Sequence, residues 1–202
     1  MRKVLIPIGD AAEAMDTLYP FFRVREDGYA AVVAGPEERV YPLVMHEIPP
    51  GWDITREQAS YHLKAEIAFA DVNPEEYDGL FITGGRAPEY LRYNKELLGI
   101  VRHFFAANKP VCVVCHGVEI ISAAGVLDGR RMTTVAKCQL DVEQGGGEYV
   151  NEGCVVSGNM VSGRTWHDQH LYKPVFMKML DQYAIRHETT ERDRQPAAIN
   201  GD

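Results

Sequence analysis

The sequence predicts an α/β protein in which helices cover both faces of a mainly parallel sheet. Short apolar runs recur along the chain, at residues 3–9, 29–35, 78–83 and 110–114. Runs of this length and composition are typical of strands buried on both faces. Stretches with helical spacing alternate with these runs, and glycines follow or end several of them. Such alternation favours a doubly wound sandwich.

The first half of the chain supplies three strands of this sheet. Asp10 is a residue type that caps helices, and apolar positions recur at helical spacing after it. The expected elements are, in order, a strand at residues 3–9, a helix from Asp10 to about Arg23, a strand at residues 29–35 and a strand at residues 78–83.

An insertion interrupts the alternation at about residues 36–66. Residues 40–48 alternate apolar and polar side chains, and Pro49-Pro50-Gly51 follows them. This pattern is typical of a hairpin rather than of a buried core strand. We interpret the insertion as a hairpin or flap, and we leave residues 54–66 without a firm assignment.

The second half continues the alternation to the end of a single domain at residues 1–185. The polar residues 186–202 are expected to form a flexible tail, with residues 197–202 disordered. The expected elements are a short helix opened by Pro88 and Glu89, a helix at 94–108, a strand at 110–114, a helix at 118–125, a strand at 130–135, a helix at 137–144, strands at 149–150, 154–157 and 160–163, and a helix at 168–183.

Cys115 lies at the turn between a buried strand and a helix, which is the position of a nucleophile elbow. Such a turn often strains the backbone of its nucleophile, and a small neighbour such as Gly117 relieves the crowding. Unpaired N–H groups of the next helix favour an anion, so we expect a lowered thiol pKa and a thiolate near neutral pH. The alternative, a buried structural cysteine, suits Cys112 better because it lies within the strand. A C-x-x-C redox pair normally opens a helix with both cysteines, so we set that interpretation aside.

Two loops at the same edge of the sheet carry further candidate residues. Glu13 could reach Cys115 and act as a general acid or base, although its residue type alone favours a helix-dipole role. Gly84 and Gly85 could leave N–H groups open as an oxyanion hole, or they could form only a tight turn.

His116 could activate the Cys115 thiol, although a residue directly after the nucleophile usually points away from it. Glu89 could orient His116. Arg86 could bind an anionic group, or it could be a surface arginine at a helix start.

Trp166 and His167 are expected at the rim of the pocket. His167 and His170 alone are too few ligands for a metal site, so we expect neither a metal nor a cofactor. Cys138 and Cys154 are expected to be structural.

The overall composition narrows the partners and the compartment. The 202 residues carry a formal net charge of −8 without a basic stripe, which argues against nucleic acid as a partner. No apolar run approaches the length of a membrane span, and the N-terminal run is too short for a signal peptide. The four cysteines do not form a disulfide pattern. We therefore expect a cytoplasmic protein in a reducing setting.

Four specific motifs occur in order along the chain. They are Gly-Gly-Arg-Ala-Pro-Glu-Tyr-Leu-Arg at 84–92, Cys-His-Gly at 115–117, Ala-Ala-Gly-Val-Leu-Asp-Gly-Arg at 123–130 and Gly-Asn-Met-Val-Ser-Gly at 158–163. In combination they resemble the DJ-1/PfpI superfamily over residues 3–183. The insertion, with Met-His-Glu-Ile at 45–48 and Ser-Tyr-His at 60–62, is similar to that of the PfpI-like and plant glyoxalase branch.

The resemblance implies a flavodoxin-like sandwich with Cys115 as nucleophile and Glu13 hydrogen-bonded to its sulfur. It places the oxyanion hole at Gly85 and the backbone of His116. In protease-like members of the family, the residue matching Glu89 pairs with the residue matching His116 across a subunit interface, which implies a homo-oligomer.

The expected function is a cysteine-dependent reaction on small reactive carbonyl compounds. The resemblance implies glutathione-independent conversion of methylglyoxal to lactate, through attack of the Cys115 sulfur on the aldehyde. The first alternative is an intracellular cysteine peptidase or amidase of PfpI type. The second is a redox-sensing or chaperone-like stress protein, in which oxidation of Cys115 is the signal.

Overall fold

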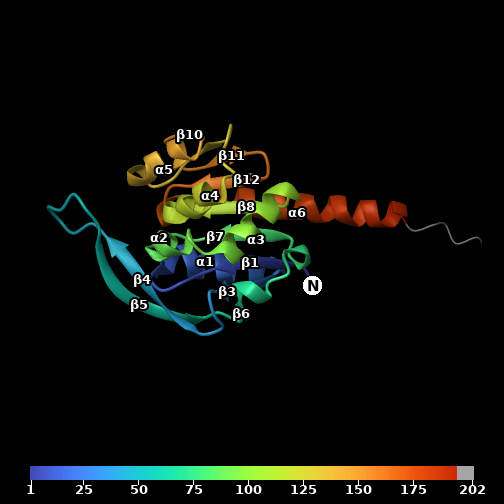
Figure 1. Ribbon diagram of the computed structural model, residues 1–202, viewed down its shortest axis with the longest axis horizontal. Helices are drawn as coiled ribbons and strands as arrows, with labels where there is room; N and C mark the ends of the chain where they lie inside the picture. Colours follow the sequence, from blue (N-terminus) through green and yellow to red (C-terminus); the bar gives the residue numbers. More distant parts are fainter. Residues whose placement is uncertain (195–202) are drawn as a thin grey trace, which may run out of the picture.

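The structure, a computed structural model, describes residues 1–194, with side chains described as far as residue 186. Its centre is a seven-stranded sheet in the order β11-β12-β8-β7-β1-β3-β6 (Figure 1). All neighbouring pairs are parallel except β11 and β12. The strands are β1 (Lys3–Pro7), β3 (Ala30–Gly35), β6 (Ile67–Ala68), β7 (Gly79–Ile82), β8 (Val111–Val114), β11 (Val155–Ser157) and β12 (Met160–Gly163).

Helices pack on both faces of this sheet, which confirms the predicted α/β sandwich. On one face α6 lies against β7, where the rings of Phe176 and Phe81 meet at a centroid distance of 5.9 Å. The same helix contacts α1, because the Gln169 side chain donates a hydrogen bond to the Met15 carbonyl at 2.8 Å. A second group of helices, α2 to α4, packs together. The helices are α1 (Ala14–Glu26), α2 (Ala87–Leu91), α3 (Lys95–Ala106), α4 (Val118–Ala124), α5 (Gln139–Gln144) and α6 (Gln169–Arg194).

The segment interpreted as a flap contains an antiparallel hairpin of β4 (Val40–Glu47) and β5 (Arg56–Lys64). Figure 1 shows the tip of this hairpin extending away from the central sheet. The middle of β4 pairs with β2 (Ala12–Glu13) in a separate three-stranded sheet. The hairpin is therefore joined to the loop that follows β1, at the edge of the sheet where the elbow lies.

Short elements complete the described chain. A small parallel pair consists of β9 (Arg131–Met132) and β10 (Glu148–Tyr149). Single 3₁₀ turns are η1 (Phe69–Asp71), η2 (Pro74–Glu76), η3 (Cys115–Gly117), η4 (Ala136–Cys138) and η5 (Trp166–Asp168).

The first helix begins later than predicted. Asp10 does not cap it, because its carboxylate binds Arg39 at 2.7 and 3.0 Å. Ala11 then adopts a left-handed conformation with φ 62°, and the chain forms β2 before it turns into the helix. Glu13 is the N-cap, and its side chain accepts a hydrogen bond from the Met15 N–H. The delay of about one turn decides which acidic side chain reaches the cysteine.

The last helix is longer than predicted. It runs on to Arg194, past the expected end of the domain at residue 185. Glu and Arg in this part of the chain are good helix formers, so its polar composition is compatible with a helix. Asp168, the expected first residue, lies in η5 instead. The predicted disorder of residues 197–202 falls outside the described residues.

Candidate active site

Cys115 occupies the strained elbow that the sequence predicts. It follows β8, opens the 3₁₀ turn η3 and has φ 55°, a left-handed conformation that costs free energy for a residue with a Cβ. Gly117 is needed at the end of the turn, because a Cβ there would lie 2.9 Å from Cγ2 of Ile82. The turn places the thiol at the carboxyl edge of the sheet, where ligands of doubly wound folds bind.

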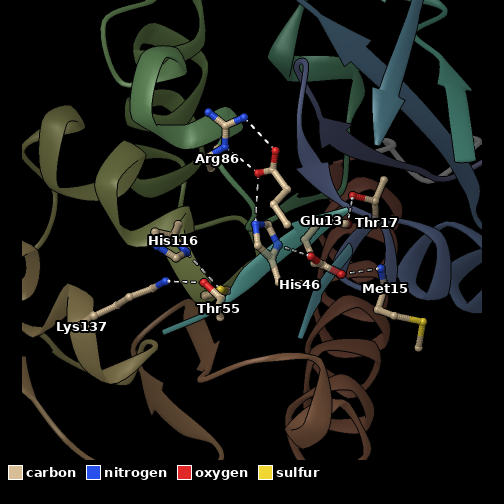
Figure 2. A network of polar contacts seen from close by, with 10 residues as sticks. Glu13, Met15, Thr17, His46, Thr55, Arg86, His116 and Lys137 are labelled. Atoms are coloured by element: carbon tan, nitrogen blue, oxygen red, sulfur yellow. Dashed lines mark hydrogen bonds and ion pairs between the residues drawn. The ribbon is translucent and has the colours of Figure 1, made fainter. Parts of the chain in front are cut away.

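The imidazole of His116 lies beside the thiol. Its Nδ1 is 3.2 Å from Sγ of Cys115, so consecutive residues face each other despite the expectation that they would point apart (Figure 2). Burial, with a smaller effect of the Lys137 charge, lowers the pKa of His116 to about 4. The ring is therefore neutral at neutral pH and can accept a proton.

The predicted lowering of the Cys115 pKa is wrong for this resting structure. Burial raises the thiol pKa well above its usual value, and the carboxyl group of Asp16 raises it further. Backbone N–H groups of His116 and Gly85 act in the opposite direction but do not outweigh burial. The elbow opens a 3₁₀ turn and a helix of only 7 residues, so the helix dipole is weak. The resting sulfur is a thiol, which loses its proton when it attacks.

The carboxyl group that faces this thiol belongs to Asp16, not to Glu13. A Cβ placed on Gly84 would lie 2.6 Å from Oδ2 of Asp16 and 3.1 Å from Sγ of Cys115. Only a residue without a side chain fits between the two groups. Among the described residues no hydrogen bond joins Glu13 to Cys115; the Glu13 carboxylate binds elsewhere.

Burial and the nearby Glu13 carboxylate raise the pKa of Asp16 well above its usual range, whereas the charge of Lys173 lowers it. The Lys173 amine is fully buried, and it lies 3.3 Å from the centroid of the Phe81 ring. Two buried acids, Asp16 and Cys115, thus share one site, and each opposes ionisation of the other.

We expect Asp16→Asn to separate thiol reactivity from turnover. Asp16 raises the Cys115 pKa when its carboxyl group is ionised, so in the variant alkylation of Cys115 by iodoacetamide should accelerate at alkaline pH and its pH profile should move to lower pH. Turnover should fall by roughly 100-fold or more, since a proton donor and acceptor is lost. Alkylation rates between pH 6 and about 10, read by mass spectrometry, test this. Slower alkylation at every pH would contradict it.

Glu13 instead begins a polar chain that links the core to the flap (Figure 2). Its Oε2 lies 2.5 Å from Nδ1 of His46 on β4, and Nε2 of the same ring lies 3.3 Å from Glu57 on β5. Arg86 binds Glu57 with both a 2.5 Å and a 2.8 Å hydrogen bond. Arg86 is therefore committed to the flap rather than free for an anion. No local pattern in the sequence predicts a role for His46, because it reaches the site from the hairpin.

The elbow opens into a cavity of about 490 Å³. The Trp166 and His167 rings stack at a centroid distance of 4.7 Å and form part of its wall. Lys137, whose Nζ lies 3.4 Å from the hydroxyl of Thr55, bridges to the flap. The lining residues are His46, Glu47, Ile48, Thr55, Cys115, His116, Val135, Lys137, Thr165, Trp166 and His167.

Gly85 holds the loop opposite the elbow. It has φ +83° and forms an isolated antiparallel bridge with Ala12. Its N–H points toward the sulfur and favours the thiolate form of Cys115. An oxyanion-hole donor must instead point at the substrate oxygen, so the assignment of Gly85 to an oxyanion hole stays a prediction.

Glu89 lies in the first turn of α2 and is exposed. Within the described residues no hydrogen bond or ion pair joins it to His116. The pairing of Glu89 with His116 of a second subunit, and hence the homo-oligomer, stays a prediction.

These features define a class of protein: a doubly wound α/β domain with a strained cysteine at the elbow and a buried acidic partner. The DJ-1/PfpI family profile matches residues 2–179. The chain is 35% identical over 178 residues to a deglycase of Thermococcus kodakarensis, covering 88% of this chain and 99% of that one. It is 34% identical to the deglycase PfpI of Pyrococcus furiosus, with the same coverage.

The structural comparison agrees with the fold. A ThiJ/PfpI domain protein from Brachyspira murdochii superimposes with a TM-score of 0.77 at 17% identity, over 90% of this chain and 96% of that one. The chain therefore belongs to the DJ-1/PfpI family. Within the described part of the chain, none of the helices has the length and apolar character needed to cross a bilayer.

Proposed function

We propose that this protein is a cysteine-dependent enzyme that acts on small reactive carbonyl compounds and converts methylglyoxal to lactate without glutathione. The observation that carries the proposal is the pairing of the strained Cys115 thiol with a neutral His116 imidazole at 3.2 Å, both lining a cavity of about 490 Å³. The relatives named deglycases support a reaction of this class.

The reaction begins with attack of the Cys115 sulfur on the aldehyde carbon. His116 accepts the thiol proton as the carbon–sulfur bond forms, and the carbonyl oxygen takes up a proton to give a hemithioacetal. Burial lowers the pKa of His116 to about 4, so the ring is unprotonated at neutral pH but is a weak base, and it takes the proton only as the carbon–sulfur bond forms. The N–H of Gly85 stabilises negative charge that develops beside the sulfur.

An internal proton transfer then converts the hemithioacetal into a thioester. The proton on the former aldehyde carbon is removed, and the neighbouring ketone carbon receives one, so that the adduct becomes a lactoyl thioester on Cys115. We assign this exchange to Asp16, because burial raises its pKa and so allows it to hold a proton near neutral pH. Water hydrolyses the thioester, which releases lactate and restores the thiol.

The flap favours a small substrate over a peptide. His46, Glu47, Ile48 and Thr55 of the flap segment form one wall of the cavity. Hydrogen bonds from Arg86 to Glu57 hold the flap against the core, so a polypeptide would have to displace the flap to enter the cavity. A molecule with the few heavy atoms of methylglyoxal fits without any such movement.

Parallel assays separate this function from its two alternatives. Purified, reduced protein without added thiol is incubated with methylglyoxal, with fluorogenic peptides, and with hydrogen peroxide. We expect lactate from methylglyoxal and no peptide cleavage. Peptide cleavage without lactate would transfer the assignment to a peptidase. Selective, reversible oxidation of Cys115 with neither turnover would favour the redox-sensing protein.

A further inference from the structure

Behind the His116 ring lies a second cluster of groups that can bind a metal ion. A ring nitrogen of His116, a carboxylate oxygen of Glu119 and the sulfur of Cys138 all lie within 4.8 Å of one another. These three side chains come from two turns that meet beside the elbow, η3 with α4 and η4. Neither Glu119 nor Cys138 takes part in the chemistry proposed above.

The backbone explains why the three groups converge. His116 and Glu119 are three residues apart across the first turn that leads from η3 into α4, so both project from the same side. Cys138 ends η4 and is 4% exposed, and Glu119 is 7% exposed. The donor groups are therefore held in the interior, where their positions are fixed by packing.

The Glu119 carboxylate carries the second observation. Its Oε2 is buried and has no hydrogen-bond partner among the described residues. The nearest cation, Arg92, is 3.6 Å away from it and lies closer to Asp141, at 3.1 Å. A buried carboxylate oxygen without a donor is costly unless something binds it. Burial also raises the pKa of Glu119 to about 7, and the charge of Arg92 offsets this only in part.

We propose that His116, Glu119 and Cys138 form a binding site for Zn²⁺. Nitrogen, oxygen and sulfur donors in this number suit zinc, which in such sites keeps a fourth position for water. Tetrahedral zinc with ordinary bond lengths requires donor atoms roughly 3.3–3.7 Å apart. The donors therefore need to close in by about an ångström. On binding, Cys138 gives its thiol proton to solvent and coordinates as the thiolate.

Zinc at this site should inhibit the reaction of Cys115 with its substrate. Zinc would coordinate a nitrogen of the His116 ring, which is the ring that accepts the Cys115 proton. The positive charge of the ion prevents that ring from accepting a proton. The ring is then unable to serve the step described above. This consequence rests on the proposed function, whereas the binding itself does not.

Calorimetric titration of the reduced, full-length protein with zinc chloride tests the site. We expect one ion per chain, and Cys138→Ser and Glu119→Gln should each weaken binding. Mutating a residue that only hydrogen-bonds to a metal ligand typically lowers metal affinity roughly 10–100-fold, so loss of a ligand itself should lower zinc affinity by at least that factor. Cys154→Ser is the matched control, because this half-buried cysteine is outside the cluster. Equal binding by wild type and both ligand variants would overturn the proposal.

Two further readouts separate the new site from the nucleophile and from turnover. With cobalt in place of zinc, the protein should show a thiolate-to-metal absorption band that is retained in Cys115→Ser and lost in Cys138→Ser. The reverse pattern would mean that the metal binds the nucleophile Cys115, and it would overturn the proposed site. Zinc should also slow alkylation of Cys115 at least tenfold in wild type but not in Cys138→Ser. Zinc binding without this protection would overturn the coupling to His116. Neither measurement requires that methylglyoxal be a substrate.

Discussion

Replacing Cys115 by alanine is expected to reduce conversion of methylglyoxal to lactate by roughly a thousandfold or more. No other described group can take over its role, because the sulfur at the elbow forms the carbon–sulfur bond and His116 Nδ1 is aimed at it at 3.2 Å. The variant should remain folded, since alanine fits any space that the cysteine fills. Lactate formation by wild type and variant, with equal far-ultraviolet circular dichroism spectra, is the measurement.

Cys112→Ala is the matched control. Cys112 lies three residues earlier in β8 and is completely buried, and burial raises its pKa to about 12. Its loss should lower stability without removing activity. If Cys112→Ala and Cys115→Ala lost activity equally while both stayed folded, the assignment of the nucleophile to the elbow would be wrong.

Gly85→Ala should cause the largest loss of stability among substitutions at the site. A Cβ there would lie 2.4 Å from both the carbonyl oxygen of Ala11 and the nitrogen of Glu13, which are backbone atoms that cannot rotate away. The φ of +83° adds strain for any residue with a Cβ. Together these effects should cost roughly 3 kcal/mol or more. For a chain of this size that lowers the melting temperature by about 6–12 °C.

Gly99→Ala provides the opposite result for the same chemical change. Gly99 is exposed within α3, and a Cβ added to it meets no atom within 4 Å. Alanine should stabilise that helix by roughly 0.5–1 kcal/mol. Differential scanning calorimetry should show a lower melting temperature for Gly85→Ala and a higher one for Gly99→Ala than for wild type. A Gly85→Ala protein as stable as wild type would show that the bridge to Ala12 does not hold the loop.

The order of the elements and the elbow could be predicted because both depend on local sequence. Buried strands are apolar runs, and the position of Cys115 between such a run and a helix needs no long-range information. The acidic partner could not be predicted in this way. It depends on where α1 begins, and the left-handed Ala11 and the short β2 delay that start, so that Asp16 rather than Glu13 faces the sulfur.

Two other features depend on contacts distant in sequence. His46 reaches the site only because β4 pairs with β2, and that register follows from tertiary packing. The protonation of the thiol depends on how completely the folded chain removes it from water. A helix start indicates a lowered pKa, whereas burial beside Asp16 raises it. The burial of one side chain cannot be read from a single strand–helix junction.

Acid-quenched mass spectrometry during turnover of methylglyoxal tests the central claim most directly. Acid preserves thioesters, so a single adduct with the mass of one methylglyoxal should appear on the peptide that holds Cys115, and it should be absent in Cys115→Ala. It should form and decay as lactate accumulates. Lactate formation with no adduct at Cys115, or with an adduct only at Cys112, Cys138 or Cys154, would contradict the account.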